Sequence, residues 1–206
     1  MANLITLARF VLVFILVVLA YVRNPAVQTI TAPLVVLIFL LDGVDGFVAR
    51  KRREETLFGA LFDIATDRMV ENVLWLVLVD LDIIPVWVAI IFLARSFVVD
   101  AIRSHGTSAG LAPFRMMRSP LARFLVAGRF MRVFYAVLKC VTFGYIFLIQ
   151  PWPDIFPNFY AAYQSHLMAI KWGLVYATVA LCLVRGLPVV YEFTAREGGL
   201  FAAFRK

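Results

Sequence analysis

The sequence has few charged residues, two cysteines and two histidines. Lys, Arg, Asp and Glu together make up 16% of its 206 residues, whereas hydrophobic residues make up 63%. A soluble domain of this length could not bury so much apolar surface, which excludes that class of protein. We therefore expect an all-α integral membrane protein that passes through the membrane several times. One transmembrane domain covering residues 1–206 suits a chain of this length.

The scarcity of cysteine and histidine limits the chemistry further. Cys140 and Cys182 fall within apolar runs, which favours ordinary core residues over a disulfide. His105 and His166 lie in polar connections, and we expect neither to bind a metal. The net charge of +7 is typical of the basic cytoplasmic loops of membrane proteins, so we expect no nucleic acid partner.

Six apolar segments are each long enough to cross the hydrocarbon, which needs about twenty residues. Basic residues cluster at 50–53, around the connection between segments four and five, and in the tail. The positive-inside rule then predicts six transmembrane helices with both termini in the cytoplasm. We expect residues 104 to about 128 to form a cytoplasmic or interfacial flap with short helical pieces. The segments run approximately over residues 5–22, 30–49, 57–79, 84–102, 130–149 and 167–190.

Four aspartates stand at fixed spacing in residues 42–67, which read DGVDGFVARKRREETLFGALFDIATD. Asp42 and Asp45 lie near the cytoplasmic end of segment two, and Asp63 and Asp67 lie near that of segment three. Within each pair, the spacing of three or four residues puts both acids on one helix face. Like charges repel, and each costs roughly 2.5–3.5 kcal/mol in the membrane. Divalent cations would resolve this conflict, and an oxygen-only donor set favours Mg²⁺, Mn²⁺ or Ca²⁺ over zinc. Four acids, Asp42, Asp45, Asp63 and Asp67, are enough for a two-metal site.

Other residues of this region have two interpretations each. Small residues beside the acids either let a bulky ligand approach the backbone or only allow close helix packing; these are Gly46, Ala49 and Gly59. Arg50 is placed to meet phosphate oxygens or to anchor the topology. Glu71 continues the acidic stripe by one turn, and either orients a ligand or pairs with Arg68 or another base.

Eight of these positions, namely the four aspartates, the three small residues and Arg50, fit the pattern DxxDGxxARx8GxxxDxxxD without a gap. This pattern resembles the signature of the CDP-alcohol phosphotransferases, also called CDP-alcohol phosphatidyltransferases, which make phospholipids. The N-terminal NLITLAR, with Asn3, Thr6 and Arg9, also resembles the start of that family. The resemblance implies transfer of a phosphatidyl group from CDP-diacylglycerol to a small alcohol with release of CMP. It also implies two divalent cations, Mg²⁺ or Mn²⁺, a homodimer, and for so small a version the bacterial inner membrane with a cytoplasmic active site.

The resemblance also assigns roles to residues. Asp42, Asp45 and Asp63 would bind the metal ions, and Asp67 would share one ion and act as general base on the acceptor hydroxyl. The nucleotide would lie against Asn3, Thr6, Asp45, Gly46, Ala49, Arg50 and Gly59.

The acceptor must be sought beyond the motif. Arg95 and Lys139 lie inside the fourth and fifth segments, and Arg129 stands at the start of the fifth. They suggest an electropositive cavity for a phosphorylated alcohol, or anchors for lipid headgroups. The stretch RSFVVDAIR, with Arg95 and Arg103, resembles bacterial phosphatidylglycerophosphate synthases, although Ser96 replaces their usual Glu. We therefore expect glycerol 3-phosphate, with inositol phosphate, serine or another polyol phosphate as alternatives.

A divalent-cation transporter is the alternative from another functional class. It could use the same acids, but it needs a polar path to the outer face of the membrane. Apart from Asn72, the outer halves of segments two and three are apolar, which favours the enzyme.

Overall fold

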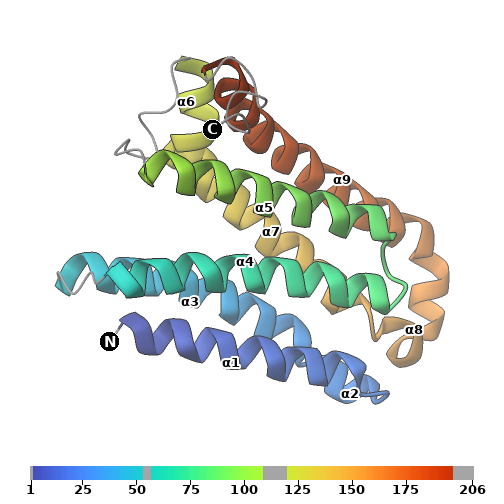
Figure 1. Ribbon diagram of the computed structural model, residues 1–206. Coiled ribbons are helices and arrows are strands. Elements are labelled where there is room, and N and C mark those ends of the chain that lie inside the picture. Colours follow the sequence, from blue (N-terminus) through green and yellow to red (C-terminus); the bar gives the residue numbers. More distant parts are fainter. Residues whose placement is uncertain (1, 53–56, 109–119, 197–206) are drawn as a thin grey trace. The chain divides into compact units, whose positions relative to one another are not determined.

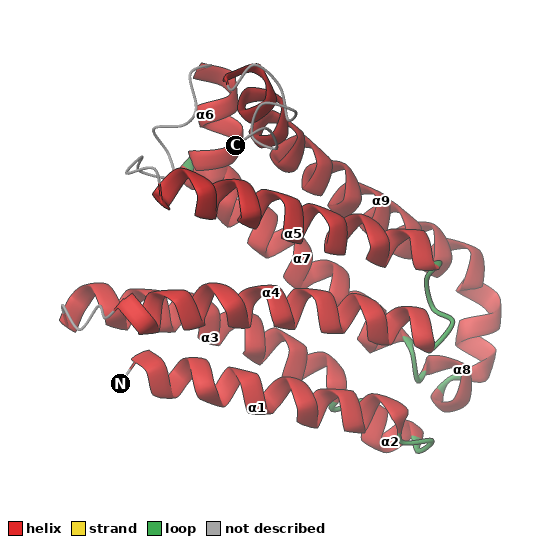
Figure 2. Ribbon diagram, in the orientation of Figure 1, coloured by secondary structure: helices red, strands yellow, loops and turns green. Residues whose placement is uncertain are grey.

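The regular elements of the protein are helices wherever the chain is described. The computed structural model describes residues 2–52, 57–108 and 120–196 (Figures 1 and 2). Each predicted apolar segment corresponds to one long helix: α1 (Ala2–Tyr21), α3 (Thr31–Arg52), α4 (Leu57–Asp80), α5 (Val86–Ser108), α7 (Arg129–Ile149) and α9 (Pro157–Arg196). Three short helices join them: α2 (Pro25–Gln28), α6 (Pro120–Ala127) and α8 (Trp152–Ile155). The all-α prediction is confirmed for this part of the chain.

Four stretches of the described residues are long and apolar enough to cross a membrane. They are Leu4–Tyr21, Pro25–Gly43, Arg129–Ile155 and Pro157–Ala195. α4 and α5 have 24 and 23 residues, which at about 1.5 Å per residue also suffices for the hydrocarbon. Both contain more charged residues, including Asp63, Asp67 and Glu71 in α4. The several apolar helices are those of a multi-pass membrane protein, while the count of six spans stays a prediction.

The internal contacts divide the chain into two compact units. The first contains Met1–Ala89 and Leu138–Val175, and the second contains Ile90–Val137 and Tyr176–Lys206. α5, α7 and α9 therefore each contribute residues to both units. We describe each unit separately.

In the first unit, α1 packs along α3 and α4 (Figure 1). Aromatic rings join α3, α4 and α7: the ring of Phe143 lies 4.5 Å from that of Trp75 and 5.9 Å from that of Phe39. Gly144 allows α7 to approach α3, since a Cβ there would lie 3.4 Å from Cγ2 of Val36. The helices that carry the acidic motif are therefore fixed by a buried aromatic core.

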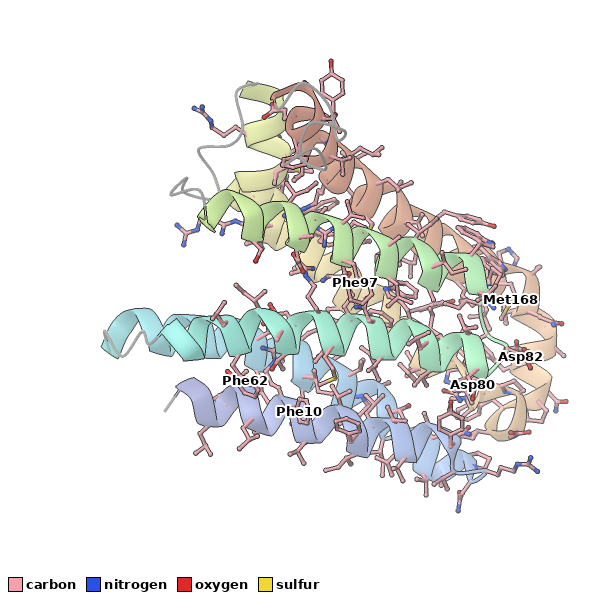
Figure 3. All side chains as sticks on the ribbon, in the orientation of Figure 1. Phe10, Phe62, Asp80, Asp82, Phe97 and Met168 are labelled. Atoms are coloured by element: carbon pink, nitrogen blue, oxygen red, sulfur yellow. The ribbon has the colours of Figure 1, made fainter. Side chains whose placement is uncertain are left out.

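The turn after α4 is held by polar contacts. Asp80 accepts a 2.5 Å hydrogen bond from the Tyr21 hydroxyl at the end of α1, and Nζ of Lys171 donates to the Ile83 carbonyl at 3.2 Å. Asp82 has a φ of 55°, the left-handed region that Asp tolerates better than most residues. Figure 3 shows Asp80 and Asp82 at the end of α4 far from its first turn.

The second unit has its own small core. Val99 and Ile102 of α5, Val126 of α6 and Val189 of α9 are buried together. The guanidinium of Arg185 on α9 donates to the carbonyls of Met131 at 2.5 Å and Val126 at 3.3 Å. These bonds hold the junction between α6 and α7 against α9.

Two predicted boundaries change. α9 begins at Pro157, so the predicted start of the sixth segment at about residue 167 is ten residues late. Proline suits the first turn of a helix because the missing N–H would have no helical partner there. In the expected flap, α5 continues to Ser108 and α6 supplies a short helical piece, while residues 109–119 lie outside the described residues.

Candidate active site

Three aspartates of the motif converge between α3 and α4. Asp42 lies on α3, and Asp63 and Asp67 lie one turn apart on α4. One carboxylate oxygen from each residue lies within 4.8 Å of the others. The predicted convergence is therefore confirmed for these three acids. Each carboxylate remains 34–42% exposed, which leaves oxygen lone pairs accessible to a ligand.

A fourth side chain enters this cluster from α1. Arg9 is only 2% exposed, and its Nη1 lies 2.9 Å from Oδ1 of Asp42 and 3.5 Å from Oδ1 of Asp63. Its Nη2 donates to Oδ1 of Asp67 at 2.7 Å. One guanidinium therefore contacts all three carboxylates, with charge-assisted hydrogen bonds at the shorter distances. We call Arg9, Asp42, Asp63 and Asp67 the charged cluster.

The direction of α1 explains how Arg9 reaches the aspartates. Arg9 meets Asp63 and Asp67 near the start of α4, and Tyr21 meets Asp80 at its end. α1 and α4 therefore run parallel, and they pack against each other. Figure 3 labels Phe10, the neighbour of Arg9 in sequence, on α1, and Phe62, the neighbour of Asp63, between α1 and α4.

The sequence analysis did not assign Arg9 to the site. Its available signal was a single arginine inside a stretch otherwise apolar enough to span a membrane. Such residues usually face a protein interior and pair with an acid. That rule predicts an acidic partner for Arg9, although it does not say which acid.

A second group of charges lies one turn further along α4. Glu71 is 2% exposed, and its Oε2 lies 3.4 Å from Nη1 of Arg68 and 3.2 Å from Nζ of Lys139 on α7. Of the two interpretations of Glu71, pairing with Arg68 and another base is confirmed. Lys139, a predicted acceptor ligand, is therefore paired with a buried carboxylate, although an ammonium has three donors and can bind a second partner.

Several predicted nucleotide ligands lie outside the described side chains. Thr6 is buried on α1, one turn before Arg9, and Gly59 is partly buried in the first turn of α4. The other five positions lie in helical backbone, but their side chains are not among those that the structure describes. They are Asn3 in α1, and Asp45, Gly46, Ala49 and Arg50 in α3.

The other predicted acceptor ligands belong to the second unit. Nε and Nη1 of Arg95 on α5 are buried and have no hydrogen-bond partner among the described residues, and the same holds for Oγ of the neighbouring Ser96. Gly186 of α9 lies against Arg95, because a Cβ there would be 2.9 Å from its Cγ. Arg129 is exposed at the start of α7, and the side chain of Arg103 lies outside the described residues.

The sequence profile of the CDP-alcohol phosphatidyltransferase family matches residues 1–184. This chain belongs to that family. The match includes all four residues of the charged cluster and both helices of the acidic motif. The resemblance inferred from the eight motif positions is therefore confirmed over most of the chain.

Curated relatives in the family are similar over about half of the chain. A CDP-diacylglycerol–glycerol-3-phosphate 3-phosphatidyltransferase of Rickettsia typhi is 31% identical over 101 residues, which are 49% of this chain and 57% of the relative. The protein of the same name from Rickettsia prowazekii has the same identity over 49% of this chain and 56% of the relative. That of Bacillus subtilis is 31% identical over 113 residues, with 49% and 58% covered. The chain thus spans less than three fifths of the length of the relatives it matches.

Proposed function

We propose that this protein transfers a phosphatidyl group from CDP-diacylglycerol to sn-glycerol 3-phosphate and releases CMP, a step of phospholipid synthesis. The observation that carries the proposal is the convergence of Asp42, Asp63 and Asp67 from two helices at motif positions of the family. The relatives from Rickettsia typhi and Bacillus subtilis, which are named for glycerol 3-phosphate, support this acceptor.

The donor set of the charged cluster fits a hard divalent cation. It offers carboxylate oxygens only, which suit Mg²⁺ or Mn²⁺. We propose that Asp42, Asp63 and Asp67, with Asp45 one turn further along α3, hold two such ions. When bound, the ions would supply positive charge to the diphosphate of the lipid nucleotide.

Asp67 is the proposed general base. Its carboxylate would take the proton of the acceptor hydroxyl as that oxygen forms a bond to the phosphatidyl phosphorus. The bond from this phosphorus to the oxygen of CMP would break, and CMP would leave with the electron pair. Because Asp67 also accepts a hydrogen bond from Arg9, its carboxylate is held in a fixed orientation.

The nucleotide would bind along the faces of α1, α3 and the first turn of α4. We propose that Gly46, Ala49 and Gly59 leave room for the cytidine and that Arg50 contacts its phosphates. Asn3, Thr6 and Asp45 complete the proposed set. Thr6 is buried next to the turn that carries Arg9, which supports its place near the charged cluster.

For the acceptor phosphate we propose Arg95 as the main ligand. Buried guanidinium nitrogens without a protein partner are uncommon, and an anionic ligand would satisfy them. Lys139, Arg103 and Arg129 are further proposed contacts. Inositol phosphate, serine and other polyol phosphates stay as alternative acceptors for the same chemistry.

We propose that the protein lies in a bacterial inner membrane and crosses it six times. Both termini and the active site would face the cytoplasm, and the protein would assemble as a homodimer. The bacterial sources of the relatives support the proposal of a bacterial membrane. Cross-linking in native membranes tests the assembly, and cysteine accessibility tests the orientation.

The activity is tested with purified protein in lipid nanodiscs, CDP-diacylglycerol, Mg²⁺ and a panel of acceptors, measuring CMP release and the mass of the lipid product. We expect CMP release with glycerol 3-phosphate and none in EDTA. Release only with another acceptor would change the assigned substrate. No release with any acceptor, together with uptake of Mn²⁺ into proteoliposomes, would replace the enzyme by the transporter.

A further inference from the structure

The charged cluster combines three acids with one base. Arg9 is 2% exposed, whereas its three carboxylate partners are 34–42% exposed. The guanidinium therefore lies on the protein side of the carboxylates, and their accessible surface faces elsewhere. Three carboxylates and one guanidinium together carry a formal charge of −2, which favours a cation beside them.

The contacts of Arg9 are divided in a specific way. Nη2 lies 2.7 Å from Oδ1 of Asp67, and Nη1 lies 2.9 Å from Oδ1 of Asp42 and 3.5 Å from Oδ1 of Asp63. A planar guanidinium can make such a set of contacts from one position, whereas an ammonium is a point charge that cannot reach three carboxylates equally well. The arrangement therefore fixes the relative positions of carboxylates from two helices.

We propose that Arg9 is a positioning residue of the metal centre, whose fixed positive charge orients the three carboxylates and limits how tightly they hold a divalent cation. This inference rests on the proposed function, because it needs a cation at the carboxylates. It adds a residue from α1 to a centre otherwise built from α3 and α4.

Arg9 affects cation affinity in two opposite ways. It aligns the carboxylates, which favours binding, and its positive charge repels the cation, which weakens binding. α3 and α4 already hold the three aspartates near one another, so the loss of alignment is partial. A unit positive charge in contact with the carboxylates repels a divalent cation strongly. Even a small fraction of this Coulomb energy changes the dissociation constant of the cation by more than tenfold. Removal of the charge should therefore tighten cation binding.

The test compares Arg9→Gln, Arg9→Lys and Arg23→Gln with the unaltered protein in nanodiscs. Arg23 is an exposed arginine just beyond the other end of α1, so its variant has the same change in net charge. Mn²⁺ dissociation constants are measured by calorimetry and by the electron paramagnetic resonance signal of free Mn²⁺. We expect binding at least about tenfold tighter in Arg9→Gln, within about threefold of the unaltered protein in Arg9→Lys, and unchanged in Arg23→Gln.

A second measurement keeps the test decisive if Arg9→Gln folds poorly. Melting is followed with Mg²⁺ and with EDTA. We expect Arg9→Gln to be folded in Mg²⁺ and to lose much more stability in EDTA than the unaltered protein does, because the cation then replaces the missing charge. Equal destabilisation in both conditions, or equal or weaker Mn²⁺ binding by Arg9→Gln, would show that Arg9 only joins helices. Absence of Mn²⁺ binding by the unaltered protein would instead refute the metal centre itself, and this inference with it.

Discussion

Nζ of Lys139 lies 3.2 Å from Oε2 of Glu71, and this pair joins α7 to α4 one turn beyond Asp67. Glu71 is 2% exposed, and Arg68, its second basic neighbour, lies on the same helix. The pair therefore supports the helix that carries two of the three clustered aspartates.

Replacing Lys139 by Met should destabilise the protein by about 1–3 kcal/mol, because the buried carboxylate of Glu71 would lose its ion pair with the Lys139 ammonium. The double variant Glu71→Gln with Lys139→Met should recover part of that loss, since the buried negative charge is then removed as well. Denaturant unfolding in detergent of both single variants and the double variant gives the coupling energy. Additive effects would show that the two side chains do not interact.

Asp67→Asn should lower turnover by about 10²–10⁴-fold, because an amide cannot accept the acceptor's proton. Turnover should fall much more than the affinities for Mn²⁺ and CDP-diacylglycerol, because the other aspartates of the motif still hold the ions. Asp80→Asn is the matched control: it makes the same change in the last residue of the same helix and should leave turnover unchanged. If Asp67→Asn loses metal binding together with turnover, Asp67 is mainly a metal ligand.

Gly186→Ala should raise the KM for glycerol 3-phosphate several-fold and leave that for CDP-diacylglycerol unchanged. A methyl group there would be 2.9 Å from Cγ of Arg95, so the arginine would have to shift. Gly173→Ala on the same helix is the control, because its Cβ would meet nothing within 4 Å. Steady-state kinetics with each substrate varied in turn measure both constants. An equal rise in the two KM values would remove Arg95 from the acceptor pocket.

Arg185→Met should loosen the junction between α6 and α7 without unfolding the chain. The variant loses hydrogen bonds to the carbonyls of Val126 and Met131, and with them the tie to α9. Hydrogen exchange measured by mass spectrometry should become faster in peptides covering residues 124–132.

Lys171→Met is a useful comparison for this experiment, since it removes the bond to the Ile83 carbonyl in the other unit. It should speed exchange near residues 81–85 and leave residues 124–132 unaffected. Uniform acceleration in both variants would mean that these bonds stabilise the whole chain instead of local junctions.

The helices and the acids were predictable because their signals are local. Apolar length predicts six long helices, and the spacing of Asp63 and Asp67 puts them on one face of a helix whatever it packs against. The start of α9 was missed because the polar and aromatic residues after Pro157 do not resemble a span. The helix there continues beyond the apolar pattern.

Arg9 shows what local patterns omit. Its partners are separated from it by 33 to 58 positions, so no spacing rule connects them. The same holds for Glu71, whose need for a base was predictable, whereas the choice of Lys139 depends on how α7 packs against α4. Pairing between distant helices is a property of the packed fold.

The position of Arg9 has a consequence for how the protein enters its membrane. α1 is made before α4, and Asp63 and Asp67 follow Arg9 by 54 and 58 residues. An arginine within a span costs roughly 2.5–3.5 kcal/mol on the insertion scale, and the carboxylates that pair with Arg9 are made only later. α1 is thus a weak anchor during synthesis, and its final placement awaits the insertion of α4. Assembly of the bundle and completion of the charged cluster are then the same event.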